Sequence, residues 1–149
     1  MASQGTIYTV GTSTRSAEEF IELLTSRGVA VAVDVRRFPS SRLEHFSKEN
    51  LSTLLHEAGI DYVHMGKELG GYRRGGYQAF TTTSQFREGI ERLTEIASGM
   101  MIAIVCAERF PWRCHRRFIS TEMEKQGWQV SHIIDQERDW LPKKNSASI

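Results

Sequence analysis

The residues best suited to chemistry lie in one segment, residues 100–117, with the sequence MMIAIVCAERFPWRCHRR. Its first eight residues are apolar or small, which predicts a strand buried on both faces and places Cys106 and Glu108 at its carboxyl end. Cys114 and His115 follow, just before a run of good helix formers that ends at Gly127. Because a helix N-terminus favours negative charge, including a thiolate, this segment offers two thiols and an imidazole in a setting that could activate them.

The cysteines allow three interpretations. Cys114 could be a nucleophile with His115 as its base, since nearby arginines would lower the pKa of the thiol. Cys106, Cys114 and His115 could instead bind a metal, although the spacing differs from the common cysteine pairs and His64 and His132 would have to complete the site. In the third interpretation Cys106 is a small buried hydrophobe and Cys114 caps a turn. The sequence leaves the three open, and we expect no disulfide framework from two cysteines.

Two carboxylates are candidates for proton transfer. Glu108 lies among arginines, where it could hold them through salt bridges or act as a general acid or base. Asp34 ends an earlier strand and is the other candidate. Two carboxylates at one edge of a sheet would make a workable acid and base pair.

The arginines indicate a class of substrate. The chain has fourteen arginines and five lysines, and nine arginines fall in three short stretches. A guanidinium presents a planar fork that suits phosphate or carboxylate, and aromatic side chains beside it could stack on unpaired bases. The alternative is that several arginines only pair with glutamates. We expect the substrate to be bound by Arg36, Arg37, His64, Tyr72, Arg73, Arg74 and Arg116.

The elements that position these residues alternate along the chain. Strands are predicted at residues 7–11, 29–35, 60–65, 100–107 and 129–134. Helices are predicted between them, with capping boxes at Ser16 with Glu19 and at Thr82 with Gln85, and with Ser47 as an N-cap. The Gly-rich residues 66–80 read as a long binding loop or lid. This order predicts an α/β fold with three layers, a mostly parallel five-stranded sheet and helices on both faces.

The three arginine stretches each follow a predicted strand. In parallel sheets the carboxyl ends of the strands share one edge, where ligands bind. We therefore expect the arginines to converge there with Cys106 and Glu108.

The whole chain suits one domain of residues 1–149, with a core at about 7–134 and a flexible tail at about 142–149. Because the longest apolar run has only eight residues, no membrane-spanning helix is expected, and the protein is predicted to be cytoplasmic. The segment LGGYRRGGY lacks a phosphate-loop pattern, which argues against ATP or dinucleotides. We predict no cofactor and no bound metal.

Several motifs together resemble a known family. Asp34-Val35-Arg36 before Pro39, then Leu69-Gly70-Gly71, then Cys106-Ala107-Glu108 with Cys114-His115-Arg116 resemble the uncharacterised "domain of unknown function 488" family. The resemblance runs from about residue 7 to 134, with Thr12 where many relatives would have His. It implies an α/β fold and a shared site, and it supplies no reaction.

These observations favour an enzyme acting on a phosphate-containing small molecule or a nucleic-acid-like substrate. The proposed site lies at the arginine-rich carboxyl edge, with Glu108 or Asp34 in proton transfer. One alternative is a nucleic-acid or anion binding module without chemistry. Another is a thiol- or metal-dependent enzyme that uses Cys106, Cys114 and His115. The sequence does not fix the strand order or the oligomeric state.

Overall fold

The protein is described by a computed structural model that covers residues 5–38, 43–71 and 73–142. Six strands form one sheet in the order β3-β2-β4-β1-β5-β6. They are β1 (Gly5–Gly11), β2 (Val31–Asp34), β3 (Asp61–His64), β4 (Ile102–Cys106), β5 (Trp128–Ile133) and β6 (Asp139–Trp140). The first five are parallel, whereas β6 runs antiparallel to β5. The predicted α/β class is confirmed, and the short β6 is added to the five strands expected.

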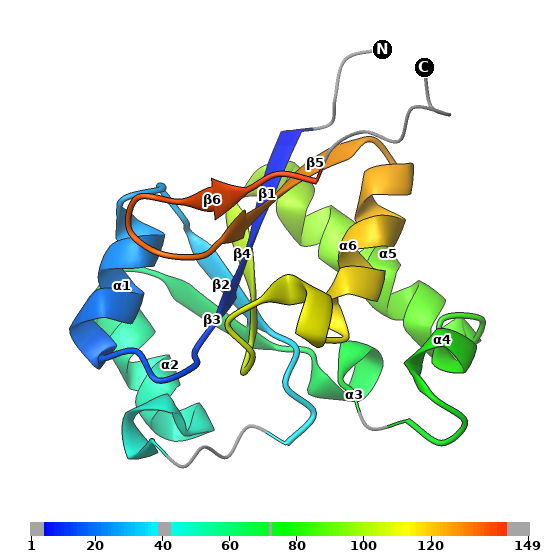
Figure 1. Cartoon of the computed structure of the whole chain (residues 1–149), viewed down its shortest axis with the longest axis horizontal. Helices are drawn as coiled ribbons and strands as arrows, with labels where there is room; N and C mark the ends of the chain where they lie inside the picture. Colours follow the sequence, from blue (N-terminus) through cyan, green and yellow to red (C-terminus); the bar gives the residue numbers. More distant parts are fainter. Residues whose placement is uncertain (1–4, 39–42, 72, 143–149) are drawn as a thin grey trace.

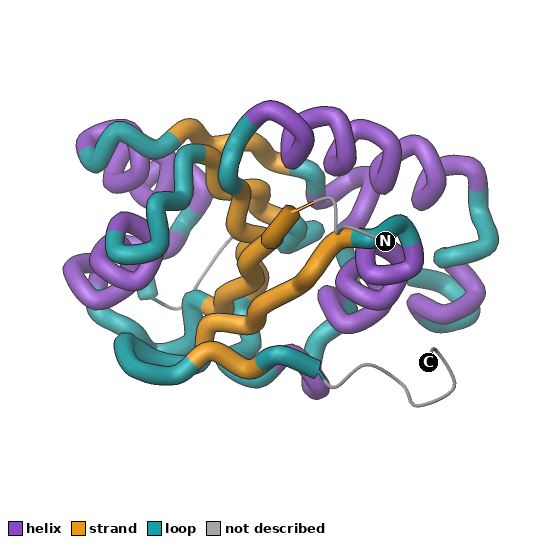
Figure 2. Tube along the Cα trace, turned by 90° about the horizontal axis from the view of Figure 1, so that it is seen from above, coloured by secondary structure: helices purple, strands orange, loops and turns teal. Residues whose placement is uncertain are grey.

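Helices cover both faces of the sheet, so that the strands form the middle of three layers (Figure 1; Figure 2). On one face lie α1 (Ala17–Thr25) and α2 (Lys48–Glu57), and on the other α5 (Ser84–Gly99) and α6 (Arg116–Lys125). Shorter helices are α3 (Gly66–Leu69), α4 (Tyr77–Phe80) and the 3-10 turns η1 (Glu44–Phe46) and η2 (Pro111–Arg113). In the described part of the chain, no helix has both the length and the apolar character to cross a membrane.

Local sequence explains where the main helices begin. The Ser16 hydroxyl accepts a hydrogen bond from the backbone N–H of Glu19, which is one half of the predicted capping box, whereas the Glu19 carboxylate accepts from Arg15. Ser47 stands at the N-cap of α2 without a side-chain bond. The cap of α5 is Thr83 rather than the expected Thr82, because the Thr83 hydroxyl accepts from the N–H of Phe86.

The Gly-rich residues 66–80 differ from the expected long loop. They contain α3 and α4, and Leu69 and Phe80 from these helices are buried in the core beneath α5. Each of these short helices thus has one buried apolar side chain that packs the segment against the domain. Apolar spacing in four-residue helices is too short to show a period, which is why the sequence pattern missed them.

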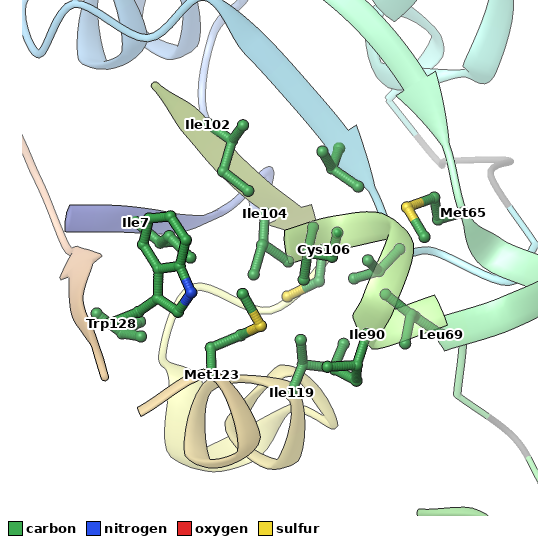
Figure 3. Packing of buried hydrophobic residues seen from close by; sticks show 14 of the residues in the cluster. Ile7, Met65, Leu69, Ile90, Ile102, Ile104, Cys106, Ile119, Met123 and Trp128 are labelled. Carbon is green, nitrogen blue, oxygen red and sulfur yellow. The ribbon is translucent and has the colours of Figure 1, made fainter. Parts of the chain in front are cut away.

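Two apolar clusters fix the sheet between its helices. One joins Ile104 of β4 to Ile90 of α5 and Ile119 of α6, and Cys106 lies within it (Figure 3). The other joins Val105 of β4 to Phe20 of α1. Because β4 is buried along its whole length between these clusters, its carboxyl end is a rigid platform for the residues that follow.

The end of β1 holds the segment that follows β4. Backbone N–H groups of Thr12 and Ser13 donate to the carbonyls of Cys106 and Ala107, both at 2.8 Å. A Cβ on Gly11 would lie 1.8 Å from the carbonyl oxygen of Glu108. Only glycine lets the two backbones approach this closely.

We therefore expect Gly11→Ala to lower the free energy of unfolding by about 1–3 kcal/mol, because the new methyl group must displace the backbone at Glu108. Gly99→Ala is the matched control, since a Cβ there meets nothing within 4 Å. Urea unfolding of both variants measures the difference. Equal stability of the two variants would contradict this close approach.

Candidate functional site

One pocket lies at the carboxyl edge of the sheet and has a volume of about 350 Å³. It is surrounded by the segments that follow two neighbouring strands and by part of the Gly-rich region. We call it the rim pocket. The chain between β4 and α6 lies at this end of the sheet beside the segment after β2 (Figure 1). The lining residues are Arg36, Arg37 and Phe38 after β2, Gly71 and Tyr77 from the Gly-rich region, and Ala107, Glu108, Arg113, Cys114 and His115 after β4.

Two free thiols lie at the base of this pocket. Cys114 lines the pocket, whereas Cys106 at the end of β4 is 1% exposed. The Cys114 S–H donates to Cys106 Sγ over 2.8 Å. We call Cys106 and Cys114 the thiol pair. Cys114 is thus the member that a bound molecule can reach, and Cys106 is the member held by the fold.

The guanidinium of Arg116 is the cation that faces the thiol pair. This side chain is 0% exposed, and its NH1 lies 2.9 Å from Cys106 Sγ. Its remaining bonds go to the carbonyl oxygens of Glu108 and Arg109. Within the described ranges no carboxylate forms a salt bridge with Arg116, and its Nε has no hydrogen-bond partner. Because a buried cation requires a nearby anion, the Cys106 thiolate is the group that can supply one.

When the thiol pair has lost one proton, the remaining proton stays on Cys114 and the charge lies on Cys106. Burial alone would raise the pKa of Cys106, but the hydrogen bond from Cys114 and the charge of Arg116 lower it to about 7. The pKa of Cys114 is raised, first because its proton is donated to Cys106 and then because of burial. The expectation that Cys114 has the lowered pKa is therefore wrong. Sequence position placed Cys114 near a helix, but the contact with the buried guanidinium is made by Cys106.

His115 presents an acceptor nitrogen to the pocket side. Its Nε2 lies 3.2 Å from the carbonyl oxygen of Val35, so this nitrogen carries the hydrogen. Nδ1 is then unprotonated and lies 3.6 Å from Cys114 Sγ. Burial lowers the pKa of His115 to about 4, which keeps the ring neutral at neutral pH. A Cβ on Gly71 would come within 3.1 Å of Nδ1, so glycine leaves this nitrogen accessible.

Asp34 belongs to a buried polar cluster behind the pocket. Its carboxylate accepts two bonds from the Arg36 guanidinium, both at 2.9 Å, and one from the Tyr62 hydroxyl at 2.6 Å. Arg36 also donates to the carbonyl of Phe46, and His64 Nε2 lies 2.9 Å from the carbonyl of Arg36. Asp34 and Arg36 therefore satisfy each other. The structure brings His64 next to Arg36 but not into the lining of the pocket.

The other expected anion ligands divide into three groups. Arg73 donates to the carbonyls of Gly70, Gly66 and Lys67 and lies over the Phe80 ring, so its guanidinium holds the Gly-rich segment. Arg74 is exposed and does not line the rim pocket, and the expected ligand Tyr72 lies outside the described residues. Arg37 and Arg113 line the pocket, as does the exposed carboxylate Glu108.

The sequence indicated Phe38 and Tyr77 as aromatic surfaces at this edge of the sheet, and it missed Gly71 as a lining residue. Tyr77, which donates its hydroxyl hydrogen to the carbonyl of Leu69, forms one wall beside His115, and burial raises its pKa. Phe38 and Gly71 also line the pocket. The only signal for Tyr77 was an aromatic residue within a Gly-rich stretch. In the described part of the chain, no group of three or more His, Cys, Asp or Glu is arranged to hold a metal ion.

The thiol pair predicts an unusual titration. We expect one thiolate per molecule to appear with a midpoint near pH 7, and the second only far above it, because the first charge opposes loss of the shared proton. Absorbance of the thiolate in the ultraviolet, followed against pH, measures both steps. Cys114→Ser, which weakens the hydrogen bond to Cys106, should raise the midpoint of the remaining thiol. Two thiolates that appear together near the ordinary pKa of cysteine would contradict this coupling.

Comparison with known proteins gives a family and one solved structure. No curated protein matches the chain. A crystal structure named "Putative phosphatase (DUF442)", from Shewanella putrefaciens CN-32, is similar with 15% sequence identity and a TM-score of 0.48. The match covers 80% of this chain and 65% of that one. The family model "Domain of unknown function DUF488" matches residues 16–123, and the chain belongs to this family.

Proposed function

We propose that this protein is an enzyme that uses the Cys114 thiol as a nucleophile on a small substrate carrying a phosphate or carboxylate group. One observation carries the proposal: Cys114 lines a pocket while its proton is directed to Cys106, whose sulfur accepts from a fully buried guanidinium. A thiol activated by an adjacent base is the usual starting point of covalent catalysis. This interpretation joins the expected phosphate chemistry to the alternative of a thiol-dependent enzyme.

Each of these residues has a separate role in the proposed reaction. As Cys114 Sγ forms a bond to the electrophilic phosphorus or carbon, its proton passes to Cys106 Sγ, 2.8 Å away. The leaving group departs into the open pocket and takes a proton from solvent. His115 Nδ1 is the acceptor that can then remove a proton from the water that releases the product from Cys114. Arg116 acts through Cys106 and is a positioning residue.

Arg37 and Arg113 support the anionic part of the substrate. Both line the rim pocket, whereas Arg36 and Arg116 give their guanidinium hydrogens mainly to Asp34, Cys106 and backbone carbonyls. A volume of about 350 Å³ suits a small molecule rather than a length of nucleic acid. A mononucleotide-like substrate remains compatible with the pocket, since Phe38 and Tyr77 offer aromatic surfaces beside the arginines.

Turnover tests the nucleophile. We expect Cys114→Ser to abolish hydrolysis of p-nitrophenyl phosphate or p-nitrophenyl acetate, because the attacking sulfur is lost. Cys106→Ser should reduce kcat by about 100-fold, since it removes the base and leaves the nucleophile. Unfolding curves of both variants control for stability. Full activity in Cys114→Ser would overturn the proposal.

Protection from alkylation tests the anion site. Inorganic phosphate should slow the reaction of Cys114 with iodoacetamide, and Arg113→Ala should weaken this protection by about 10-fold through loss of one charge-assisted contact. Arg74→Ala is the matched control, an exposed arginine that does not line the pocket. Absence of protection in the unaltered protein would remove the anionic substrate. Protection without turnover of any ester would favour the non-catalytic anion binding module.

A further inference from the structure

The thiol pair has a property that group transfer does not require. A nucleophile needs one sulfur and a base, yet here the base is itself a second sulfur, 2.8 Å from the first. The two come from different elements, because Cys106 ends β4 and Cys114 follows η2. A sulfur–sulfur bond between them needs an approach of less than about 1 Å, given a bond length of about 2.05 Å.

The surroundings of the two sulfurs are unequal. Cys114 lines the rim pocket, and Cys106 is buried behind it in the apolar cluster that also contains Ile104 and Ile119 (Figure 3). A small molecule can therefore reach Cys114 first. Cys106, held as a thiolate by Arg116, is in place to attack the sulfur of Cys114 once that sulfur has been modified.

We propose that Cys106 and Cys114 form a dithiol that reduces the disulfide bond of a low-molecular-weight compound, with Cys114 as the attacking and Cys106 as the resolving thiol. This activity does not depend on the group transfer proposed above. It uses the same pocket, and carboxylates on the disulfide compound would meet Arg37 and Arg113. The class of substrate is an anionic organic disulfide.

The reaction balances in two steps. Cys114 passes its proton to Cys106 and attacks one sulfur of the substrate, which forms a mixed disulfide and releases the first thiolate. Cys106 then loses that proton to solvent and attacks the Cys114 sulfur, which forms the internal disulfide and releases the second thiolate. The protein loses two electrons and the substrate gains them, while the two released thiolates take their protons from solvent.

Arg116 shifts the equilibrium between the dithiol and the internal disulfide. Its guanidinium lies 2.9 Å from Cys106 Sγ in the reduced protein and would lose its anion in the disulfide. The guanidinium therefore favours the dithiol, so oxidation of the pair runs forward when the disulfide substrate is in excess, and a monothiol returns the internal disulfide to the dithiol for the next turnover. Removing the guanidinium should shift the equilibrium with a glutathione buffer toward the disulfide by about tenfold, the equivalent of one pKa unit.

Oxidised glutathione is the probe for the full-length protein, followed by acid quenching and mass spectrometry. The unaltered protein should lose the mass of two hydrogens and carry no glutathione. Cys106→Ser should trap one glutathione on Cys114, and Cys114→Ser should react far more slowly because Cys106 is 1% exposed. Glutathione adducts on the unaltered protein without an internal disulfide, or no oxidation at all, would overturn the proposal.

Two further measurements make the result specific. The protein unfolded in guanidinium chloride should accumulate adducts on both cysteines, which shows that the fold directs the internal disulfide. Arg116→Met should shift the reduced-to-oxidised ratio as stated, and an unchanged ratio would contradict the role of Arg116. If Arg116→Met does not fold, the two serine variants still decide the dithiol. Loss of ester turnover without loss of this oxidation would separate the two proposals.

Discussion

The buried guanidinium of Arg116 is the interaction on which the site depends. A cation that is 0% exposed must be neutralised or hydrogen-bonded where it lies, and three of its contacts reach Cys106 Sγ and the carbonyls of Glu108 and Arg109. These contacts fold the segment after β4 back over the end of its own strand. The same geometry brings Cys114 against Cys106. One side chain thus shapes the loop and sets the charge of the thiol pair.

Several arginines at the carboxyl edge serve the fold. Arg36 is paired with Asp34, Arg73 donates to three backbone carbonyls, and Arg15 donates to the carbonyls of Gly11 and Ile134. Loops that follow strands leave carbonyl groups without strand partners, and the five donors of a guanidinium can satisfy several of them at once. Arginines at this edge of the sheet therefore serve in part to hydrogen-bond the carbonyl groups of the loops. Of the arginines that line the pocket, Arg36 is paired with Asp34, and Arg37 and Arg113 are the ones that we propose meet the substrate.

The sequence predicted the architecture well because its signals are local. Alternating apolar strands and capped helices, such as that beginning at Ser16, gave the α/β class and the positions of all five parallel strands. Their carboxyl ends share one edge in any such sheet, so the meeting of the segments after β2 and β4 could also be foreseen. The strand order could not, because it depends on contacts between distant elements. The two-residue β6 is too short to show a pattern.

The site was predicted by residue type better than by role. Cys106, Cys114 and His115 lie together, as their positions between the end of one strand and the start of the next helix predict. Which thiol carries the charge depends on where a guanidinium points, and no sequence pattern encodes that. The same limit applies to Asp34 and Arg36, whose proximity in sequence fits both a substrate site and the buried pair that they form.

The short strand β6 has a consequence for how the protein behaves at high concentration. It pairs Ile133 and His132 of β5 with Asp139 and Trp140, and Arg27 of the neighbouring layer anchors Asp139. It covers the last two of the six residues of β5, and so shortens the margin of the sheet onto which another chain could add a strand. The opposite margin, β3, is only four residues long. Both margins of the sheet are therefore short, which limits the edge-to-edge aggregation to which open sheets are prone.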